Sequence, residues 1–163
     1  MNNIKLARVD NRYIHGQVSA RLVRELGITK ILLISDACAA DPLMSELYKL
    51  MAVDFGVDVL SIQDAADKWR EGAFNSEPAL LLLWGNIGDA VKSYQMGMKY
   101  AELALANIPG NGNNIRVNNS CYITGDEAGE LKKLSADGVE VYFQATTDIP
   151  KVSLDEALKI TKL

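Results

Sequence analysis

His15 is the only histidine of the chain, and it lies in a short polar segment between an apolar run and an amphipathic one. Arg12 precedes it by three residues, and Gly16 follows it directly. A neutral imidazole nitrogen can accept a phosphoryl group, and an arginine can form two hydrogen bonds to phosphate oxygens without losing its charge. A glycine at this place leaves room for a bulky tetrahedral group near the backbone. These residue types and their spacing favour phosphoryl chemistry at His15.

Further polar residues flank this pair. Arg8 stands two residues before Asp10, so both belong to one face of an extended strand. Asp10 either holds Arg12 in place, accepts a hydrogen bond from the imidazole, or simply caps the turn. Arg8 either adds positive charge or pairs with a carboxylate, and Gln17 either donates to a phosphate or is an ordinary residue of a first helical turn. We expect a catalytic residue, His15, and a phosphate-binding group of Arg12, Asp10, Gly16 and Gln17.

Other site chemistries lack the residues they need. Cys38 and Cys121 are far apart and form no C-x-x-C motif, so we expect reduced, buried thiols. With a single histidine the chain offers no zinc-ligand cluster, and we predict neither a metal nor a cofactor. The glycines at 85–88, 110–112 and 125–129 complete neither a G-x-G-x-x-G motif nor a P-loop, and no G-x-S-x-G elbow is present. Trp84 is expected at the edge of the core and not as a platform for a sugar.

Composition predicts an ordinary globular protein. The 163 residues, 48% hydrophobic and 23% charged, fit a single domain, 1–163, that can bury a sizeable core. The net charge of −4 argues against a general nucleic-acid binder or a polybasic membrane binder. No apolar run approaches the length of a membrane span, and the first residues do not resemble a secretory signal. We therefore expect a cytoplasmic protein.

Short apolar runs alternate with longer amphipathic ones, which predicts an α/β fold with a mostly parallel sheet covered by helices on both faces. The predicted strands are Ile4–Val9, Ile31–Ile34, Val57–Ile62, Ala79–Trp84, Ala101–Ile108, Val117–Ile123 and Val139–Phe143. The predicted helices are Gly16–Leu26, Leu43–Val53, one that begins at Ala65, Ile87–Met96, Thr124–Leu134 and Ser153–Leu158. Ligands of such folds bind beyond the carboxyl ends of the strands, which directs attention to the loop after the first strand.

Several boundaries have a chemical signal. Gly27 ends the first helix, and Asp41-Pro42 combines an N-cap with a proline at the first helical position. Capping-box spacing occurs at Thr124–Glu127 and again at Ser153–Glu156. The segment Pro109–Asn114 is rich in glycine and asparagine, and we expect an exposed loop inside the domain.

The segment Arg8–Val18, which reads RVDNRYIHGQV, closely resembles the phosphorylation-site signature of enzyme IIB in the mannose–fructose–sorbose class of bacterial phosphotransferase systems, which includes N-acetylgalactosamine systems. Weaker similarity to the same family extends over essentially the whole chain. It is found at Ile34-Ser35-Asp36, Ala39-Ala40-Asp41, Val117-Asn118-Asn119, Gly138-Val139 and Pro150. The family's Asn-Val-Gly-Gly-like segment is replaced here by Asn107–Gly112, so this loop should have a different shape.

The resemblance implies an open, mostly parallel twisted sheet with the active-site loop after its first strand. It further implies that His15 receives a phosphoryl group on Nδ1 from a phosphohistidine of a IIA protein, with Arg12 facing the group. His15 would then pass it to a sugar bound by the membrane components IIC and IID during uptake, as a protein-N(π)-phosphohistidine–sugar phosphotransferase. No IIA-like segment accompanies the domain, so we expect a separate IIA donor, and contact with the membrane only through partners.

Two alternatives remain open. A flavodoxin-like module could bind a phosphate or nucleotide at the same place without covalent chemistry, and its binding would survive loss of His15. A receiver-like domain would carry the phosphoryl group on an aspartate, but this needs a pair of acidic residues, and residue 11 next to Asp10 is an asparagine.

Overall fold

The computed structural model describes residues 3–163, apart from the side chains of Gln17 and Val18. Its strands are β1 (Ile4–Asp10), β2 (Lys30–Ile34), β3 (Gly56–Leu60), β4 (Leu80–Trp84), β5 (Glu102–Asn107), β6 (Ile115–Arg116), β7 (Tyr122–Ile123), β8 (Glu140–Phe143) and β9 (Val152–Ser153). Its helices are α1 (Gly16–Leu26), α2 (Asp36–Ala40), α3 (Pro42–Leu50), α4 (Ile62–Arg70), α5 (Ile87–Gln95), α6 (Gly125–Ala136) and α7 (Leu154–Thr161).

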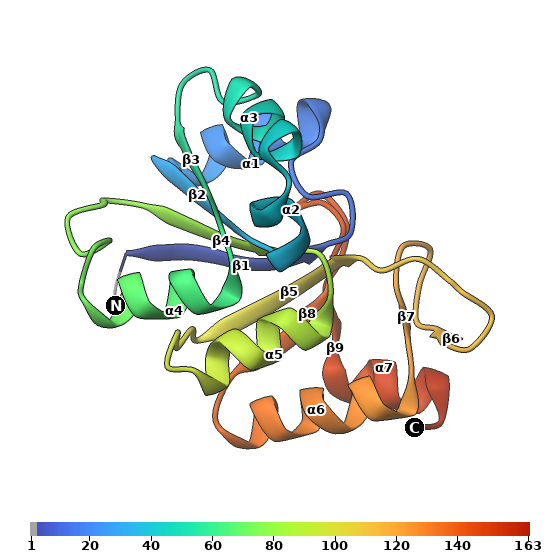
Figure 1. Ribbon diagram of the computed structural model, residues 1–163. Helices are drawn as coiled ribbons and strands as arrows, with labels where there is room; N and C mark the ends of the chain where they lie inside the picture. The colour runs from blue at the N-terminus through green and yellow to red at the C-terminus, as the bar shows by residue number, and fades with distance from the viewer. Residues whose placement is uncertain (1–2) are drawn as a thin grey trace.

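Seven of the strands form one sheet in the order β3-β2-β4-β1-β5-β8-β9, and β6 and β7 form a separate antiparallel ribbon. All neighbours in the large sheet are parallel except β8 and β9. Helices α1, α2 and α3 lie on one face of the sheet, and α4, α5, α6 and α7 lie on the other (Figure 1). The predicted α/β architecture with an open, mostly parallel sheet is therefore confirmed.

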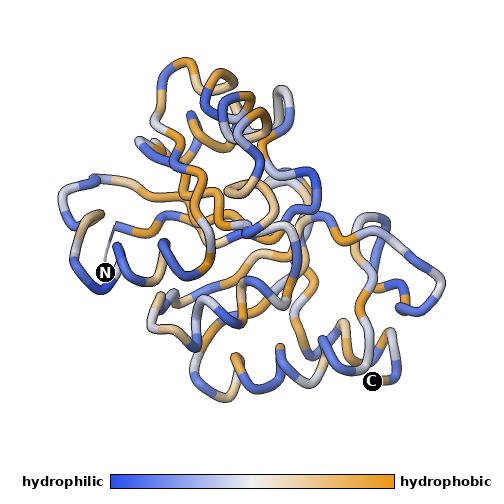
Figure 2. Tube along the Cα trace, in the orientation of Figure 1, coloured by the Kyte–Doolittle hydropathy of each residue, from blue (hydrophilic) through white to orange (hydrophobic). Residues whose placement is uncertain are grey.

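The core has two parts, one on each side of the sheet, because successive residues of a strand point to opposite faces. In β1, Ala7 and Val9 pack under α4 to α7, whereas Leu6 packs on the side of α1 to α3. Along the chain the most hydrophobic stretches coincide with the central strands (Figure 2). β4 is buried at every position, as its run of four leucines and a tryptophan indicates.

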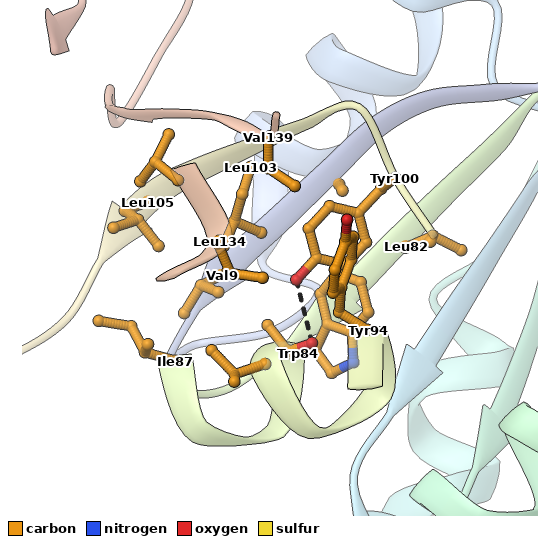
Figure 3. Close-up of a cluster of buried hydrophobic side chains, with 14 of the residues drawn as sticks. Val9, Leu82, Trp84, Ile87, Tyr94, Tyr100, Leu103, Leu105, Leu134 and Val139 are labelled. Carbon is orange, nitrogen blue, oxygen red and sulfur yellow. Dashed lines mark hydrogen bonds between the residues drawn. The ribbon is translucent and has the colours of Figure 1, made fainter. Parts of the chain in front are cut away.

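Trp84 belongs to the core and is fully buried. Its indole N–H donates to the Ser93 hydroxyl at 2.9 Å, and its ring packs against Tyr100, which in turn contacts Tyr94. These rings gather where α5 covers the sheet (Figure 3). The indole is thus a deeply packed side chain, further inside than the edge position we predicted, and it cannot serve as a platform for a sugar.

The structure differs from the predicted elements in a few places. Ile62 does not end a strand but begins α4, because the Ser61 hydroxyl accepts from Asp64 N at 3.0 Å and Asp36 accepts from Ile62 N at 2.8 Å. Residues 51–53 lie outside α3, and of the predicted strand 117–123 only Tyr122–Ile123 is a strand. Sequence analysis also missed α2, β6 and β9, which have five residues or fewer.

The predicted caps are confirmed. Gly27 ends α1 in the left-handed conformation, and the Asp41 carboxylate accepts from the first turn of α3. Both capping boxes are formed, at the starts of α6 and α7. In the loop 109–114 the asparagines bond within the loop: Asn114 contacts Asn111 N and Pro109 O, so the segment closes on itself.

The topology places the loop after β1 at the point where the connections diverge to opposite faces of the sheet. β1 lies between β4 and β5, and its connection leads to α1 on one face of the sheet, whereas the connection from β4 leads to α5 on the other (Figure 1). Such a divergence of connections opens space at the carboxyl ends of the strands. Across the described part of the chain, no helix has the length and apolar character needed to span a membrane.

Candidate functional site

His15 lies at the carboxyl edge of the sheet, between β1 and α1. A tight turn follows β1, in which Tyr13 N donates to the Asp10 carbonyl at 2.9 Å. His15 is then the N-cap of α1, with extended backbone angles, and its own N–H donates to the Ser19 hydroxyl at 3.0 Å. Its ring does not cap the helix, and 22% of the side chain is exposed. The imidazole is therefore held by its backbone but open to a reaction partner.

Asp10 is the centre of the site. Its Oδ2 lies 2.9 Å from His15 Nε2 and 2.9 Å from Arg8 Nη2. Its Oδ1 accepts from the backbone N–H of Arg12 at 3.0 Å and from Arg12 Nε at 3.2 Å. The roles considered separately for Asp10 are thus combined: the carboxylate holds Arg12, contacts the imidazole ring and caps the turn.

The protonation state of Asp10 follows from these contacts. Burial by itself would raise the pKa of the carboxyl, but the hydrogen bonds from His15 and Arg12 and the charge of Arg8 outweigh it, so the pKa lies below its ordinary value. The ionised carboxylate only accepts hydrogen bonds. His15 Nε2 must then carry the hydrogen, which leaves the lone pair of the neutral imidazole on Nδ1.

Arg8 supports this carboxylate from inside the protein. The side chain is buried, and Nη2 donates both to Asp10 and, at 3.0 Å, to the carbonyl of Ala145. Desolvation lowers the pKa of Arg8, and the charge of Asp10 partly offsets this effect. Of the two roles considered for Arg8, pairing with a carboxylate is the one that the structure shows.

Arg12 lies at the surface of the same cluster. About half of its side chain is exposed, 48%, whereas that of Asp10 is completely buried. Asp10 contacts Nε and Nη2 of the guanidinium group, and the exposed part of the side chain is accessible from solvent. Arg12 is therefore placed to reach an anion that arrives at the imidazole.

The first turn of α1 completes the arrangement. Gly16 has a φ of 45°, and beyond its chain neighbours and the backbone of its own helix no described heavy atom lies within 4 Å of the position that a Cβ would take. The first turn of α1 itself contains no acidic residue that would offset the partial positive charge of the helix N-terminus. The predicted role of Gln17 concerns a side chain outside the described residues.

Sequence reasoning missed the residues that hold the loop from outside. Asn107, at the end of β5, accepts from Asn11 N at 2.9 Å, and the Tyr13 hydroxyl bonds to Ser35 after β2. These partners, like Ala145, come from distant parts of the chain, and no local spacing indicates them. For Ser19 a signal exists, because serine in a first helical turn often bonds to the N-cap backbone.

Metal chemistry finds no support in the described residues, where no group of three or more histidine, cysteine or acidic side chains is suited to an ion. The two cysteines are free and buried, as expected. Burial raises the pKa of Cys121 to about 12, so its thiol stays protonated and weakly nucleophilic. The chemical capacity of the site thus resides in one imidazole, two arginines, one carboxylate and a helix N-terminus.

Comparison with known proteins gives a family match over nearly the whole chain. Residues 4–163 match the family model described as "PTS system sorbose subfamily IIB component". A protein of Escherichia coli K12 named "PTS system mannose-specific EIIAB component" is 29% identical over 98% of this chain and 48% of its own length. An N-acetylgalactosamine-specific phosphotransferase enzyme IIB component of the same organism is 24% identical over 97% of this chain and 100% of its own.

Solved structures agree on the fold. The IIB domain of the sorbose permease of Klebsiella pneumoniae superimposes with a TM-score of 0.89 at 20% identity, over 96% of each chain. The manxB protein of Thermoanaerobacter tengcongensis has a TM-score of 0.89 at 26% identity, over 96% of this chain and 95% of its own. The chain spans about half the length, 48%, of the mannose-specific relatives it matches.

Proposed function

We propose that this chain, which belongs to the family of PTS system sorbose subfamily IIB components, carries a phosphoryl group on Nδ1 of His15. The observation that carries the proposal is the 2.9 Å contact between Asp10 Oδ2 and His15 Nε2. It leaves Nδ1 with its lone pair, so the ring is ready to attack phosphorus. Membership of a phosphotransferase family supplies the reaction class for a site whose geometry suits it.

In the first step, Nδ1 forms a bond to phosphorus while the bond to the donor's nitrogen breaks. Nε2 keeps its hydrogen, so the phosphorylated ring is positively charged, and the Asp10 carboxylate stabilises this charge. Arg12 and the N-terminus of α1 contribute positive charge for the phosphoryl oxygens. Such a site acts by positioning and electrostatics, which is what phosphoryl transfer requires.

The remaining roles are part of the same proposal. A IIA protein, expected as a separate chain, donates the phosphoryl group, and a sugar held by membrane components IIC and IID accepts it. The relatives' names point to different sugars, mannose in one case and N-acetylgalactosamine in another, so the proposal leaves the sugar unassigned. We place residues 1–163 in one IIB domain that works in the cytoplasm and meets the membrane through its partners.

The test is transfer of labelled phosphate from phosphoenolpyruvate through enzyme I, HPr and a mannose-class IIA protein. Wild type and His15→Ala are run together, and phosphorylated IIA is measured in the same reactions as the control. We expect an acid-labile, base-stable label on the wild type and none on His15→Ala, which has no other histidine. A label that survives His15→Ala, or that base removes as it removes an acyl phosphate, contradicts the proposal.

The alternative binding module makes a different prediction in the same experiment. If phosphorylated IIA donates to neither protein, while both bind inorganic phosphate equally, the domain binds anions without covalent chemistry. The carrier proposal requires a label on His15, so this result excludes it for the donor tested, and further IIA proteins of the class then decide whether donor choice is responsible.

A further inference from the structure

The loop that presents His15 contains an unusual backbone conformation at Tyr13. Its φ is 56°, in the left-handed region that residues with a side chain seldom adopt. Within residues 3–163 only Lys162, at the end of α7, shares this feature without being a glycine. Such a conformation costs on the order of 1 kcal/mol or more and persists where the surroundings enforce it. We therefore expect contacts of the Tyr13 side chain to hold its backbone in this conformation.

The first restraint is a hydrogen bond. The Tyr13 hydroxyl donates to the Ser35 hydroxyl oxygen at 3.1 Å. Ser35 is itself fixed, because it is buried at the carboxyl end of β2 and caps α2 by accepting from Cys38 N at 3.3 Å. Desolvation raises the pKa of the Tyr13 phenol, so the hydroxyl keeps its hydrogen for donation. The phenol thus connects the loop to β2.

The second restraint is a close fit to Gly85, directly after β4. A Cβ at this position would lie 2.9 Å from Tyr13 Cε1 and closer still to Cζ and the hydroxyl oxygen. Residue 85 must therefore lack a side chain for the phenol ring to occupy its site. On another side the ring meets Tyr48 of α3 edge-on, with centroids 5.9 Å apart. The ring is held between the ends of β2 and β4 and the helix α3.

We propose that Tyr13 is a positioning residue for His15, and that the space left by Gly85 is what allows it to act. This positioning role rests on the proposed function of His15. Tyr13 lies between Arg12, whose backbone N–H binds Asp10, and His15, whose ring binds the same carboxylate. Anchoring the phenol fixes the loop against the ends of β2 and β4 and so fixes Nδ1 toward a donor. A displacement of about 1 Å at a reacting atom can slow a reaction about 100-fold.

The experiment combines Gly85→Ala, Tyr13→Ala and the double variant, with Tyr94→Phe as a control for the loss of a distant phenol hydroxyl. The kcat and KM for transfer from phosphorylated IIA are measured together with the ¹⁵N shifts of the His15 ring. The shifts report the Asp10–His15 contact without any transfer. We expect Gly85→Ala to lower kcat about 100-fold with little change in KM, and to move the ring signals.

The double variant shows whether the effect acts through the ring. Once Tyr13→Ala has removed the phenol, adding Gly85→Ala should change kcat less than about 2-fold, because nothing remains to be displaced. Tyr13→Phe keeps the ring and loses only the Ser35 bond, so it should retain more activity than Tyr13→Ala, and Tyr94→Phe should behave as the wild type. Equal losses from Gly85→Ala in both backgrounds would overturn the proposal.

The ring signals separate this proposal from the proposed function. If wild type accepts phosphate but Gly85→Ala leaves the His15 signals and kcat unchanged, the positioning role is wrong and the carrier function stands. If no protein accepts phosphate, yet Gly85→Ala moves the His15 signals and the change is lost in the Tyr13→Ala background, the positioning role stands and the carrier function fails.

Discussion

At the scale of single residues, the site depends on a buried charge that has several partners. Asp10 is completely buried and satisfies Arg8, Arg12 and the His15 ring at once. Replacing a buried ion pair by apolar groups is often tolerated, whereas removing one partner leaves the other charge buried and uncompensated. The Arg8–Asp10 contact should therefore affect mainly the stability of the fold, and the Asp10–His15 contact mainly the phosphoryl transfer.

We predict that Asp10→Asn lowers the free energy of unfolding by about 3–5 kcal/mol, because the buried guanidinium of Arg8 loses its counter-charge. The double variant Arg8→Met/Asp10→Asn should recover most of this loss. Urea unfolding of the wild type, Asp10→Asn and the double variant measures the three free energies of unfolding. Phosphoryl transfer should be reduced about 10- to 100-fold in both variants, since neither has the carboxylate that orients the ring. A double variant as unstable as Asp10→Asn would contradict the charge argument.

The local part of the site could be predicted from the sequence, and the distant part could not. Arg8, Asp10, Arg12 and His15 lie within eight residues, so strand alternation and the turn are enough to bring them together. The partners of Tyr13 depend instead on how β2 and β4 are placed beside β1. Spacing along the chain carries no information about that placement.

At the scale of elements, side-chain caps decide where several helices begin. The Thr124 hydroxyl accepts from Glu127 N at 3.1 Å, and the Glu127 carboxylate accepts from Thr124 N at 2.8 Å. This pattern was recognisable because both partners are local and three residues apart. Ser61 caps α4 through its hydroxyl alone, which accepts from Asp64 N. The apolar residues before and after Ser61 made Ile62 resemble the end of a strand.

We predict that Thr124→Ala destabilises the protein by about 1 kcal/mol, because the N-terminus of α6 loses an acceptor for a backbone N–H. Ser135→Ala, at an exposed position near the other end of α6, is the matched control. It should be neutral or slightly stabilising, since alanine has the higher helix propensity. Thermal unfolding of both variants measures the difference, and equal effects at the two positions would rule out a role for the cap.

At the scale of the whole molecule, the order of the strands gathers the site from segments far apart in the chain. β1 is central, so its carboxyl end meets the ends of β4 and β5, while β2 supplies Ser35 one strand further away (Figure 1). The parallel arrangement was predictable from the alternation of apolar and amphipathic runs. The strand order was not, because the apolar strands of this sheet are similar enough to exchange places without changing the pattern.

The burial of Asp10 links the site to the stability of the protein at acid pH. Among the described carboxyl groups whose pKa is lowered, Glu25, Asp67, Asp148 and Glu156 lie at the surface, and their interactions are screened by solvent. Asp10 is the buried member of this set. Its folded pKa lies below the unfolded value of about 3.9, so its stabilising effect is complete above that value and is lost as the pH falls through the folded pKa.

We therefore predict that the free energy of unfolding of the wild type decreases as the pH falls below about 4, where Asp10 becomes protonated. Arg8→Met/Asp10→Asn lacks the linked carboxyl, so its free energy of unfolding should fall less steeply below pH 4, and the two curves should converge. Urea unfolding at a series of pH values measures both. Asp67→Asn is the control: it removes a carboxyl with lowered pKa at the surface and should keep the wild-type slope. Parallel curves for the wild type and the double variant would show that the protonation of Asp10 is not linked to folding.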